Sequence, residues 1–297
     1  MDSWATKGVD LIGKFRTVKF MIIDKETKVC GIIGYPLEHT LSPAIHNAAA
    51  QYHKLNVVFL AFPTLDPKGA IAGMRALGWR ELTVTMPYKE KVIPYLDELD
   101  SVAEVLGNVN TIINEKGKLK GYNTDITGIE LSLADVRLKG KTVVLLGAGG
   151  VSNTVAFAIK KKGGSLHIFN REQRSAQLLA KRFGASSWSN LDNLDQKVLE
   201  RRPYLIINAT PVGMGKLRGQ SLLDKKTVAG AKVVFDSIYN PTATKLLKDA
   251  QAAGCRVING RTMFLGQGAR QFELWSGRPA PMPLLAKVFD ASIKARR

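Results

Sequence analysis

A glycine-rich turn carries the strongest chemical signal in the sequence. The apolar run VVLL at residues 143–146 is typical of a buried parallel strand, and a helical pattern of apolar residues starts at residue 151. Glycines in such a turn let the backbone approach a pyrophosphate, and the helix start offers it free N–H groups. We therefore expect a dinucleotide to bind at Gly147, Ala148, Gly149, Gly150 and Val151.

The end of the next predicted strand, residues 165–169, indicates which dinucleotide. The glycines depart from the full G-x-G-x-x-G pattern, so a turn without a ligand is the alternative. The residues after this strand favour a ligand, because Asn170 and Arg171 follow it and Arg174 lies one helical turn further on. NAD-binding units carry an acidic residue about 20 positions after the glycines, where it holds the ribose 2′-hydroxyl. A guanidinium suits a 2′-phosphate, which favours NADP. Glu172 would repel that phosphate if it pointed inward, so NAD stays open, whereas in the first turn of a helix it would complement the dipole.

A lysine at position 89 is the next candidate for chemistry. The segment MPYK at residues 86–89 is predicted to lead from a strand into a helix, where a cation near the N-terminus is unfavourable. Such a conflict between a local rule and the sequence is typical of a functional residue. The alternative is an ordinary surface lysine.

Polar side chains also follow other predicted strands. Thr40 and Ser42 would face a polar ligand together, although Ser42 before a proline also suits a helix N-cap. Asn123 and Asp125 follow a hairpin, where capping is again the alternative. Gln267 stands between two glycines on an otherwise apolar helix, which allows a polar ligand to come close, or else it is exposed.

The elements that must position these residues alternate between strand and helix patterns, which predicts an α/β fold. Before the glycine turn we expect strands at 29–34, 57–62 and 81–85, a hairpin at 108–125, and helices at 44–52, 66–77 and 93–106, the last interrupted by Pro94. After it we expect strands at 165–169, 204–208, 232–236 and 256–259, and helices at 175–183, 262–275 and 283–295. A short strand is expected around 19–23, His39 is expected to be structural, and His46 and His53 are expected at the surface or half-buried.

The composition is that of a globular protein, with 45% hydrophobic and 23% charged residues. A length of 297 residues suggests two domains. Apolar runs stay well below the ~18 residues of a membrane span, and we expect neither a membrane helix nor a secretory signal. We expect Cys30 and Cys255 to be buried thiols in a reducing cytoplasm, and the spacing of His and Cys suggests no metal site.

The formal net charge of +18 allows three classes of partner, namely nucleic acid, anionic membrane and anionic small ligands. The basic residues are spread along the chain, and no nucleic-acid motif accompanies their short runs. We therefore interpret the charge as a solvated basic surface that steers an anionic cofactor and an acidic substrate.

Taken in order, several segments resemble the shikimate dehydrogenase family, including its quinate/shikimate branch. GYPLEHTLSP at 34–43 looks like the family's substrate-carboxylate loop, and TMPYKE at 85–90 matches the segment with its catalytic lysine. NT at 110–111, GYNTD at 121–125 with the catalytic aspartate, YNP at 239–241 and QGA at 267–269 match later segments. The resemblance covers residues 29–277. The sequence departs from the family pattern in two places. Thr40 stands in place of serine, and residues 170–175 read NREQRS in place of N-R-T-x-x-R, with Glu for Thr and the second Arg displaced by one position.

The resemblance implies reversible hydride transfer that interconverts 3-dehydroshikimate and shikimate, with NADP as cofactor. Lys89 and Asp125 are then the catalytic residues, with Lys89 as the candidate general acid and Asp125 orienting it. Which of the two carries the proton in the rate-determining step stays open at the level of the sequence. The implied substrate-binding residues are Thr40, Ser42, Thr85, Lys89, Asn110, Asp125, Tyr239 and Gln267. The implied cofactor-binding residues are Gly147, Ala148, Gly149, Gly150, Val151, Asn170, Arg171, Arg174, Thr210 and Gly260.

The resemblance also implies the architecture. We expect an α/β substrate domain at 1–126, a doubly wound Rossmann domain that binds NAD(P) at 127–260, and C-terminal helices at 261–297 that return to the first domain. The site is expected in the cleft between the domains. The implied partner is the small-molecule substrate, with neither nucleic acid nor membrane, for a cytoplasmic monomer or homodimer.

Two alternatives remain. The first is a quinate/shikimate dehydrogenase that prefers quinate or NAD, which Thr40 and Glu172 would support. The second is a catalytically silent protein that binds a dinucleotide or nucleic acid, against which the intact Lys89 and Asp125 argue.

Overall fold

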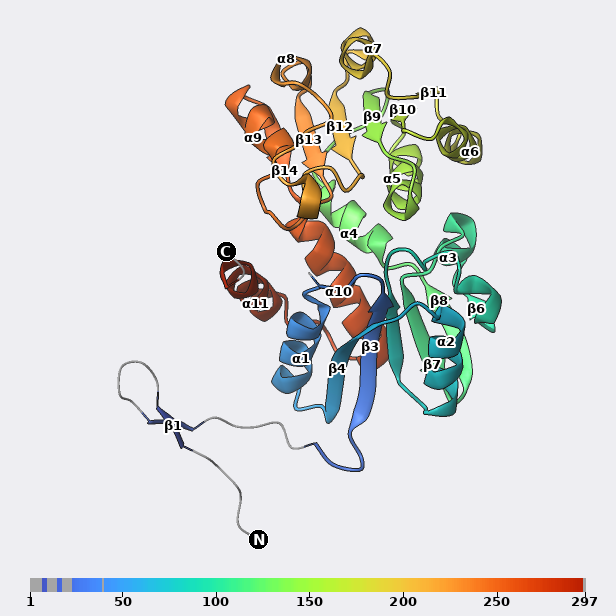
Figure 1. Ribbon diagram of the computed structural model, residues 1–297, viewed down its shortest axis with the longest axis vertical. Helices are drawn as coiled ribbons and strands as arrows, with labels where there is room; N and C mark the ends of the chain where they lie inside the picture. The colour runs from blue at the N-terminus through green and yellow to red at the C-terminus, as the bar shows by residue number, and fades with distance from the viewer. Residues whose placement is uncertain (1–6, 10–14, 18–22, 39, 296–297) are drawn as a thin grey trace.

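The computed structural model describes residues 7–9, 15–17, 23–38 and 40–295. Within them lie two six-stranded sheets, one above the other in Figure 1, and a small antiparallel pair made of β1 (Lys7–Val9) and β2 (Phe15–Thr17). His39 and most of the strand expected around 19–23 lie outside the described residues.

The first sheet has the strand order β4-β3-β5-β7-β8-β6. Its strands are β3 (Lys28–Gly34), β4 (Val57–Pro63), β5 (Glu81–Val84), β6 (Glu98–Leu99), β7 (Thr111–Glu115) and β8 (Lys118–Tyr122). β3 runs parallel to β4 and β5, whereas β7 and β8 form the antiparallel hairpin that the sequence predicts. Alternate residues of β3 face opposite cores, so Ile32 packs beneath α1 (Ser42–Tyr52) and Ile33 packs against α2 (Pro67–Ala76).

The second sheet is entirely parallel, with the order β11-β10-β9-β12-β13-β14. Its strands are β9 (Thr142–Leu146), β10 (Ser165–Phe169), β11 (Ser187–Ser189), β12 (Leu205–Asn208), β13 (Val233–Asp236) and β14 (Arg256–Ile258). Numbered in chain order within the sheet, this is the 3-2-1-4-5-6 order of a Rossmann domain. The predicted doubly wound fold is therefore confirmed.

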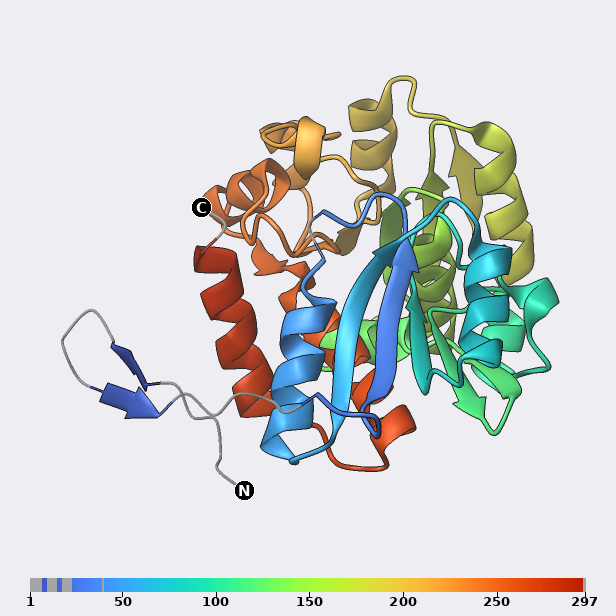
Figure 2. The same cartoon turned by 60° about the horizontal axis from the view of Figure 1, so that its bottom comes forward.

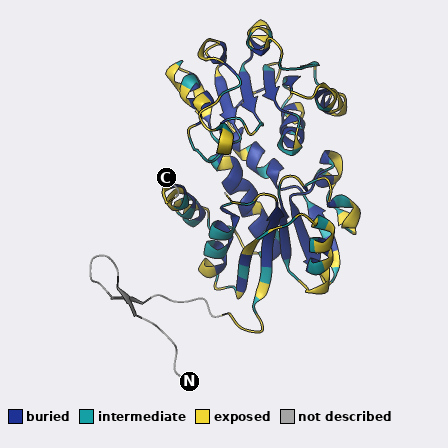
Figure 3. Ribbon diagram, in the orientation of Figure 1, coloured by how far each residue is buried: buried dark blue, intermediate teal, exposed yellow. Residues whose placement is uncertain are grey.

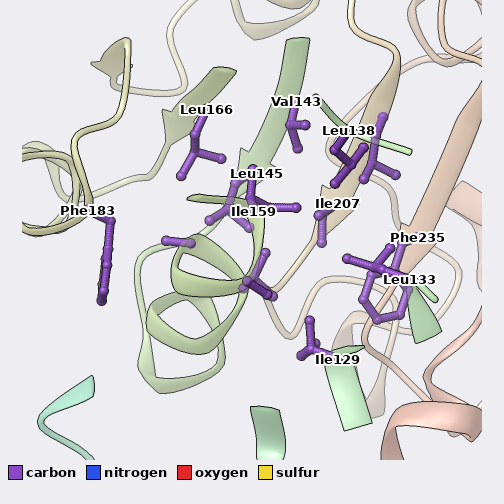
Figure 4. Close-up of a cluster of buried hydrophobic side chains, with 14 of the residues drawn as sticks. Ile129, Leu133, Leu138, Val143, Leu145, Ile159, Leu166, Phe183, Ile207 and Phe235 are labelled. Carbon is purple, nitrogen blue, oxygen red and sulfur yellow. The ribbon is translucent and has the colours of Figure 1, made fainter. Parts of the chain in front are cut away.

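Helices cover both faces of this second sheet. One face packs against α5 (Gly150–Lys161) and α6 (Gln173–Phe183), and Figure 4 shows part of that core, with Leu145 of β9 next to Ile159 of α5. The other face packs against α7 (Leu194–Arg201), α8 (Lys225–Val228) and α9 (Lys245–Ala252). β11, α7 and α8 were not predicted from the sequence.

Two helices connect the sheets. α4 (Asp125–Ser132) contacts α5 on one side and α10 (Gly260–Ser276) on the other. A Cβ at Gly128 would overlap the Met263 backbone, so the two helices cross at close range. α10 then runs beneath the first sheet, and α11 (Met282–Lys294) lies alongside α1 (Figure 2). The C-terminal helices therefore return to the first sheet, as predicted.

The predicted helix at 93–106 is wrong. A short 3-10 helix at Ile93–Tyr95 is followed by β6 and then by α3 (Ser101–Leu106). Asp97 explains part of the difference, because its carboxylate accepts a hydrogen bond from the Leu119 N–H (2.6 Å) and so helps hold this segment beside β8. The carboxylate of Asp100 then accepts from the Ala103 N–H and caps α3.

Buried residues concentrate on the strands of both sheets and on α4 and α10 between them (Figure 3). His46 belongs to this interior with 1% exposure, so the predicted surface or half-buried position is wrong. The reason is that α10, which follows far along the chain, covers this face of α1. Cys30 and Cys255 are buried, free thiols. Among the described helices, each is too short or too polar to serve as a membrane span.

Candidate active site

The side chains of Lys89 and Asp125 form a largely buried ion pair. Lys89 Nζ lies 2.5 Å from Asp125 Oδ2, and the two side chains are 15% and 5% exposed. Lys89 lies in the turns after β5, and Asp125 is the first residue of α4. The predicted pairing of an ammonium with a carboxylate distant in sequence is therefore present. The helix start that we expected at Lys89 is not, because turns occupy residues 89–92.

The carboxylate of Asp125 is used for this pair and not for capping. Thr124 occupies the N-cap position of α4, and within the described residues no side chain caps this helix. Asp125 Oδ1 accepts from Asn110 Nδ2 at 2.9 Å, while the amide of Asn123 donates to Asn108. The capping alternative for Asn123 and Asp125 is therefore wrong.

The amide of Asn110 is bonded on both sides. Its Oδ1 accepts from the Thr124 N–H (2.8 Å) and from Thr111 Oγ1 (2.9 Å). Its Nδ2 donates to Thr124 Oγ1 (3.0 Å) as well as to Asp125. Asn110 therefore fixes the orientation of the Asp125 carboxylate, and its contact with a ring hydroxyl stays a prediction.

The ion pair lies beside the glycine turn. A Cβ on Gly150, the first residue of α5, would stand 3.6 Å from Lys89 Cδ. Asn108 Nδ2 also donates to the Gly150 carbonyl oxygen at 3.4 Å. Groups carried by the first sheet and a helix start carried by the second thus form one site.

The glycine turn has the shape that a pyrophosphate requires. Gly147 has φ +110, and a Cβ there would stand 3.0 Å from both the Ala209 carbonyl oxygen and Thr210 Cγ2. At Gly149 no described atom lies within 4 Å of a Cβ position, so one side of the turn is open. The start of α5 adds free N–H groups and the positive end of the helix dipole. The turn therefore fits a dinucleotide phosphate.

The residues after β10 emerge at the same edge. The Gly147 N–H donates to the Phe169 carbonyl at 2.7 Å, so Asn170 and Arg171 begin directly beside the turn. Glu172 occupies the N-cap position of α6, and its carboxylate accepts from Ser175 Oγ at 2.6 Å. The acidic group is thus bonded within its own helix start, while Arg171 and Arg174 are exposed.

The Asp236 carboxylate, for which no sequence pattern predicted a role, joins two further segments at this edge. It accepts from Asn208 Nδ2 (3.1 Å), at the end of β12, and from Thr244 Oγ1 (2.7 Å), just before α9. Burial raises the pKa of Asp236 to about 6. Thr210 Oγ1 donates to the Asn208 side chain as well, at 2.7 Å. A Cβ at Gly260 would overlap the Ser237 carbonyl, so only glycine fits there.

The hydroxyls of Thr40 and Ser42 follow β3 at the edge where Lys89 follows β5. α1 begins at Ser42 itself, with Leu41 at the N-cap position, and among the described side chains none caps this helix. The N-cap alternative for Ser42 is therefore wrong, because the N-cap position lies one residue earlier, at Leu41. The Ser42 N–H donates to Thr40 Oγ1 at 3.3 Å, and Thr85 contacts Gly34 at the end of β3.

Gln267 lies in α10, and Tyr239 packs against this helix. Gln267 is buried, and its Nε2 donates to the Phe264 carbonyl at 3.0 Å. The ring of Tyr239 packs on Phe264, with centroids 4.6 Å apart. Substrate contact of these two residues stays a prediction.

Gln271 is a buried polar residue near the ion pair that was not predicted from the sequence. This side chain is fully buried, and its Nε2 donates to Thr111 Oγ1 (3.0 Å) and to the Asn110 carbonyl (3.3 Å). Its spacing of four residues from Gln267 was the available signal, because residues i and i+4 share one face of a helix.

Comparison with known proteins gives the family. The profile of the shikimate dehydrogenase substrate binding domain matches residues 32–112, which include Lys89 and Asn110. The profile named shikimate / quinate 5-dehydrogenase matches residues 130–211, and that of the shikimate 5′-dehydrogenase C-terminal domain matches residues 260–284. An NADP(+) shikimate dehydrogenase of Carboxydothermus hydrogenoformans is 43% identical over 279 residues, which cover 92% of this chain and 100% of the relative.

The chain belongs to the shikimate dehydrogenase family.

Solved structures of shikimate dehydrogenases share its fold. One, crystallised in complex with NADP+, has a TM-score of 0.83 and 37% identity over 92% of this chain and 98% of its own. The Thermus thermophilus enzyme in complex with NADP(H) and shikimate has a TM-score of 0.78 and 30% identity, over 89% of this chain and 99% of its own. Asp125 and Tyr239 fall outside the three matched profile ranges, so the geometry is the evidence for Asp125.

Proposed function

We propose that this protein is an NADP-dependent shikimate dehydrogenase, which interconverts 3-dehydroshikimate and shikimate. The observation that carries the proposal is the Lys89–Asp125 pair beside Gly150, because it joins a proton donor to a dinucleotide-binding turn. NADP(+) shikimate dehydrogenases at 43% and 41% identity support the choice of activity and cofactor.

Lys89 performs the proton chemistry. When bound, NADP exchanges a hydride with the ring carbon that carries the ketone or hydroxyl. A ketone that is being reduced develops negative charge on its oxygen, and the Lys89 ammonium stabilises that charge and delivers a proton to it. In the reverse direction the neutral amine takes up the proton of the hydroxyl. Asp125 holds the lysine in position and binds a ring hydroxyl.

The remaining residues bind the substrate. Thr40 and Ser42 hold the substrate carboxylate through their hydroxyls, supported by their position after β3. The other substrate-binding residues are Thr85, Asn110, Tyr239 and Gln267.

The cofactor lies on the glycine turn. Gly147 to Val151 hold the pyrophosphate, Thr210 and Gly260 line the neighbouring loops, and Asn170, Arg171 and Arg174 hold the 2′-phosphate. The carboxylate of Glu172 is held within its own helix start by the bond from Ser175. The NADP(+) dehydrogenases at 43% and 41% identity support NADP over NAD. The same relatives argue against the NAD-dependent quinate alternative.

We further propose the division into a substrate domain at 1–126, a cofactor domain at 127–260 and C-terminal helices at 261–297. The matched ranges 32–112, 130–211 and 260–284 support it, since each lies almost wholly within one part. The net charge of +18 serves to steer the anionic cofactor and substrate, not to bind nucleic acid. We propose a cytoplasmic monomer or homodimer, and the buried free cysteines support a reducing compartment.

Initial rates with shikimate and quinate, each with NADP and with NAD, test the function. We expect shikimate with NADP to give the highest kcat/KM of the four pairs. A preference for quinate with NAD would establish the alternative dehydrogenase. If neither substrate is oxidised with either cofactor, the proposed function is wrong.

A further inference from the structure

Behind the ion pair, a row of buried polar side chains extends from α1 to the Asp125 carboxylate. His46 Nε2 lies 3.3 Å from Gln271 Oε1, and Gln271 Nε2 donates to Thr111 Oγ1 at 3.0 Å. Thr111 Oγ1 donates to Asn110 Oδ1 at 2.9 Å, and Asn110 Nδ2 donates to Asp125 Oδ1 at 2.9 Å. Together these bonds join α1, α10, β7 and the start of α4.

The chemistry of the groups fixes which atom donates and which accepts in each hydrogen bond of the row. An ionised carboxylate only accepts hydrogen bonds, so Asn110 must present its NH2 group to Asp125 and its oxygen to Thr111. Thr111 then donates to that oxygen and accepts from Gln271, whose oxygen is left facing His46. His46 must therefore carry its proton on Nε2, and its Nδ1 has no partner within the described residues. Burial supports the neutral form, because it lowers the pKa of His46 to about 4.

We propose that His46, Gln271 and Thr111 are positioning residues that fix the amide of Asn110 and thereby aim the Asp125 carboxylate at Lys89. The inference rests on the proposed function and extends it to residues that touch neither substrate nor cofactor. An Asn110 amide turned over would set its oxygen against a carboxylate oxygen, which is two acceptors face to face. The bond from Thr111 favours the productive orientation, and the Thr124 N–H supports the same orientation from the other side.

Burial distinguishes this role from ordinary packing. Thr111 and Gln271 are both 0% exposed, and an apolar side chain of the same shape would fill either position without the cost of burying polar groups. The polar atoms instead hydrogen-bond to one another one after the next, and the last of these bonds is made to Asp125 of the ion pair. The arrangement is therefore fitted to orient Asp125.

A set of isosteric variants tests the proposal. Thr111→Val removes the hydroxyl and keeps the shape, and we expect kcat with shikimate to fall roughly 3- to 15-fold with little change in KM, as for one lost hydrogen bond. We expect the kcat of Gln271→Met to fall by a factor within the same range. Thr111→Ser keeps the hydroxyl and should restore kcat to within about twofold of the unaltered protein. Thr227→Val is the matched control, since this buried threonine lies in α8 on the other sheet.

The double variant separates one connected row from two independent packing sites. If the row acts as a unit, Gln271→Met adds little to the loss that Thr111→Val already causes. Two losses that multiply, or a Thr111→Val variant with unchanged kcat, would overturn the proposal. A drop that Thr111→Ser fails to restore would also overturn it.

Nitrogen NMR of the histidines gives a readout that is independent of turnover. We expect His46 to be neutral and protonated at Nε2, and to lose this tautomer preference in Gln271→Met. A His46 protonated at Nδ1 would overturn the inference even in an active enzyme. If the unaltered protein oxidises no shikimate but shows the expected tautomer, the proposed function fails while the row itself stands.

Discussion

The Cδ atom of Lys89 lies 3.6 Å from the point where a Cβ on Gly150 would stand. Lys89 follows β5 of the first sheet, whereas Gly150 begins the helix after β9 of the second. The lysine stem therefore passes against the helix start of the second sheet, while its ammonium ends on Asp125. The proposed proton donor therefore lies against the start of the helix that is proposed to hold the cofactor phosphate.

Replacing Lys89 by Met tests the proton donor. Met keeps an unbranched stem against Gly150 and removes the ammonium, so we expect kcat to fall by roughly 10²- to 10⁴-fold while the protein stays folded. Lys91→Met is the control, because Lys91 is exposed in the same turn. A Lys89→Met enzyme whose kcat stays within about tenfold of the unaltered protein would exclude Lys89 as general acid.

Replacing Arg171 by Ser tests the choice of cofactor. Loss of a charge-assisted hydrogen bond to the 2′-phosphate should raise the KM for NADP roughly 10- to 100-fold and leave that for NAD nearly unchanged. Arg201→Ser removes an exposed arginine from the end of α7 and controls for general charge steering. Equal effects on both cofactors would show that Arg171 does not contact the phosphate.

Replacing Gly147 by Ala tests the shape of the turn. A φ of +110 is strained for alanine, and the added Cβ would meet the Ala209 carbonyl at 3.0 Å. We expect a loss of about 1–3 kcal/mol in the free energy of unfolding, measured by denaturant titration, together with weaker NADP binding. Gly149→Ala separates the two effects, since the open space there should preserve stability while the Cβ hinders the phosphate. An unchanged stability of Gly147→Ala would contradict the geometry of the turn.

Asp236 should make stability decrease as pH rises. Its pKa is raised from 3.8 to about 6 by burial, so the folded state keeps a proton that the unfolded chain has already released. The contribution, about 3 kcal/mol, is complete below pH 3.8 and is lost as pH rises through about 6. Asp236→Asn should remove this slope from the free energy of unfolding measured across the interval. A variant with the same slope as the unaltered protein would assign it to other groups.

His46 should produce the opposite slope. Its pKa is lowered from 6.5 to about 4, so the unfolded chain takes up a proton that the folded state refuses. The contribution, again about 3 kcal/mol, is complete above pH 6.5 and is lost as pH falls to about 4. His46→Phe keeps a ring stacked on Phe59 and should abolish this acid-side loss in thermal unfolding measured across that range. Persistence of the loss in the variant would mean that His46 titrates normally.

Sequence patterns predicted the elements that are determined by residues close together in the chain. The strand at 165–169 has the predicted bounds, and the glycine turn stands where the spacing indicated. The segment 93–106 failed because β6 forms by pairing with β8, which no local pattern reports.

The candidate site shows the same limit. Ser42 and Asp125 suit helix caps by type, but Asp125 is bonded to Lys89, 36 residues away in the chain. The position of His46 was predicted wrongly and Gln271 was missed, because their partners lie on other elements; Gln271 reaches Thr111 across 160 residues. Contacts of this kind depend on how the chain folds as a whole, and the local preferences of the residues do not reveal them.

The course of α10 also bears on synthesis at the ribosome. Phe272 and Trp275 of this helix complete the core beneath the first sheet, which begins with β3. While a nascent chain has emerged only as far as β14, the face of that sheet that packs against α1 still lacks α10. The later-made Rossmann sheet already has all six strands at that stage, so the half that is translated first is the half that is finished last.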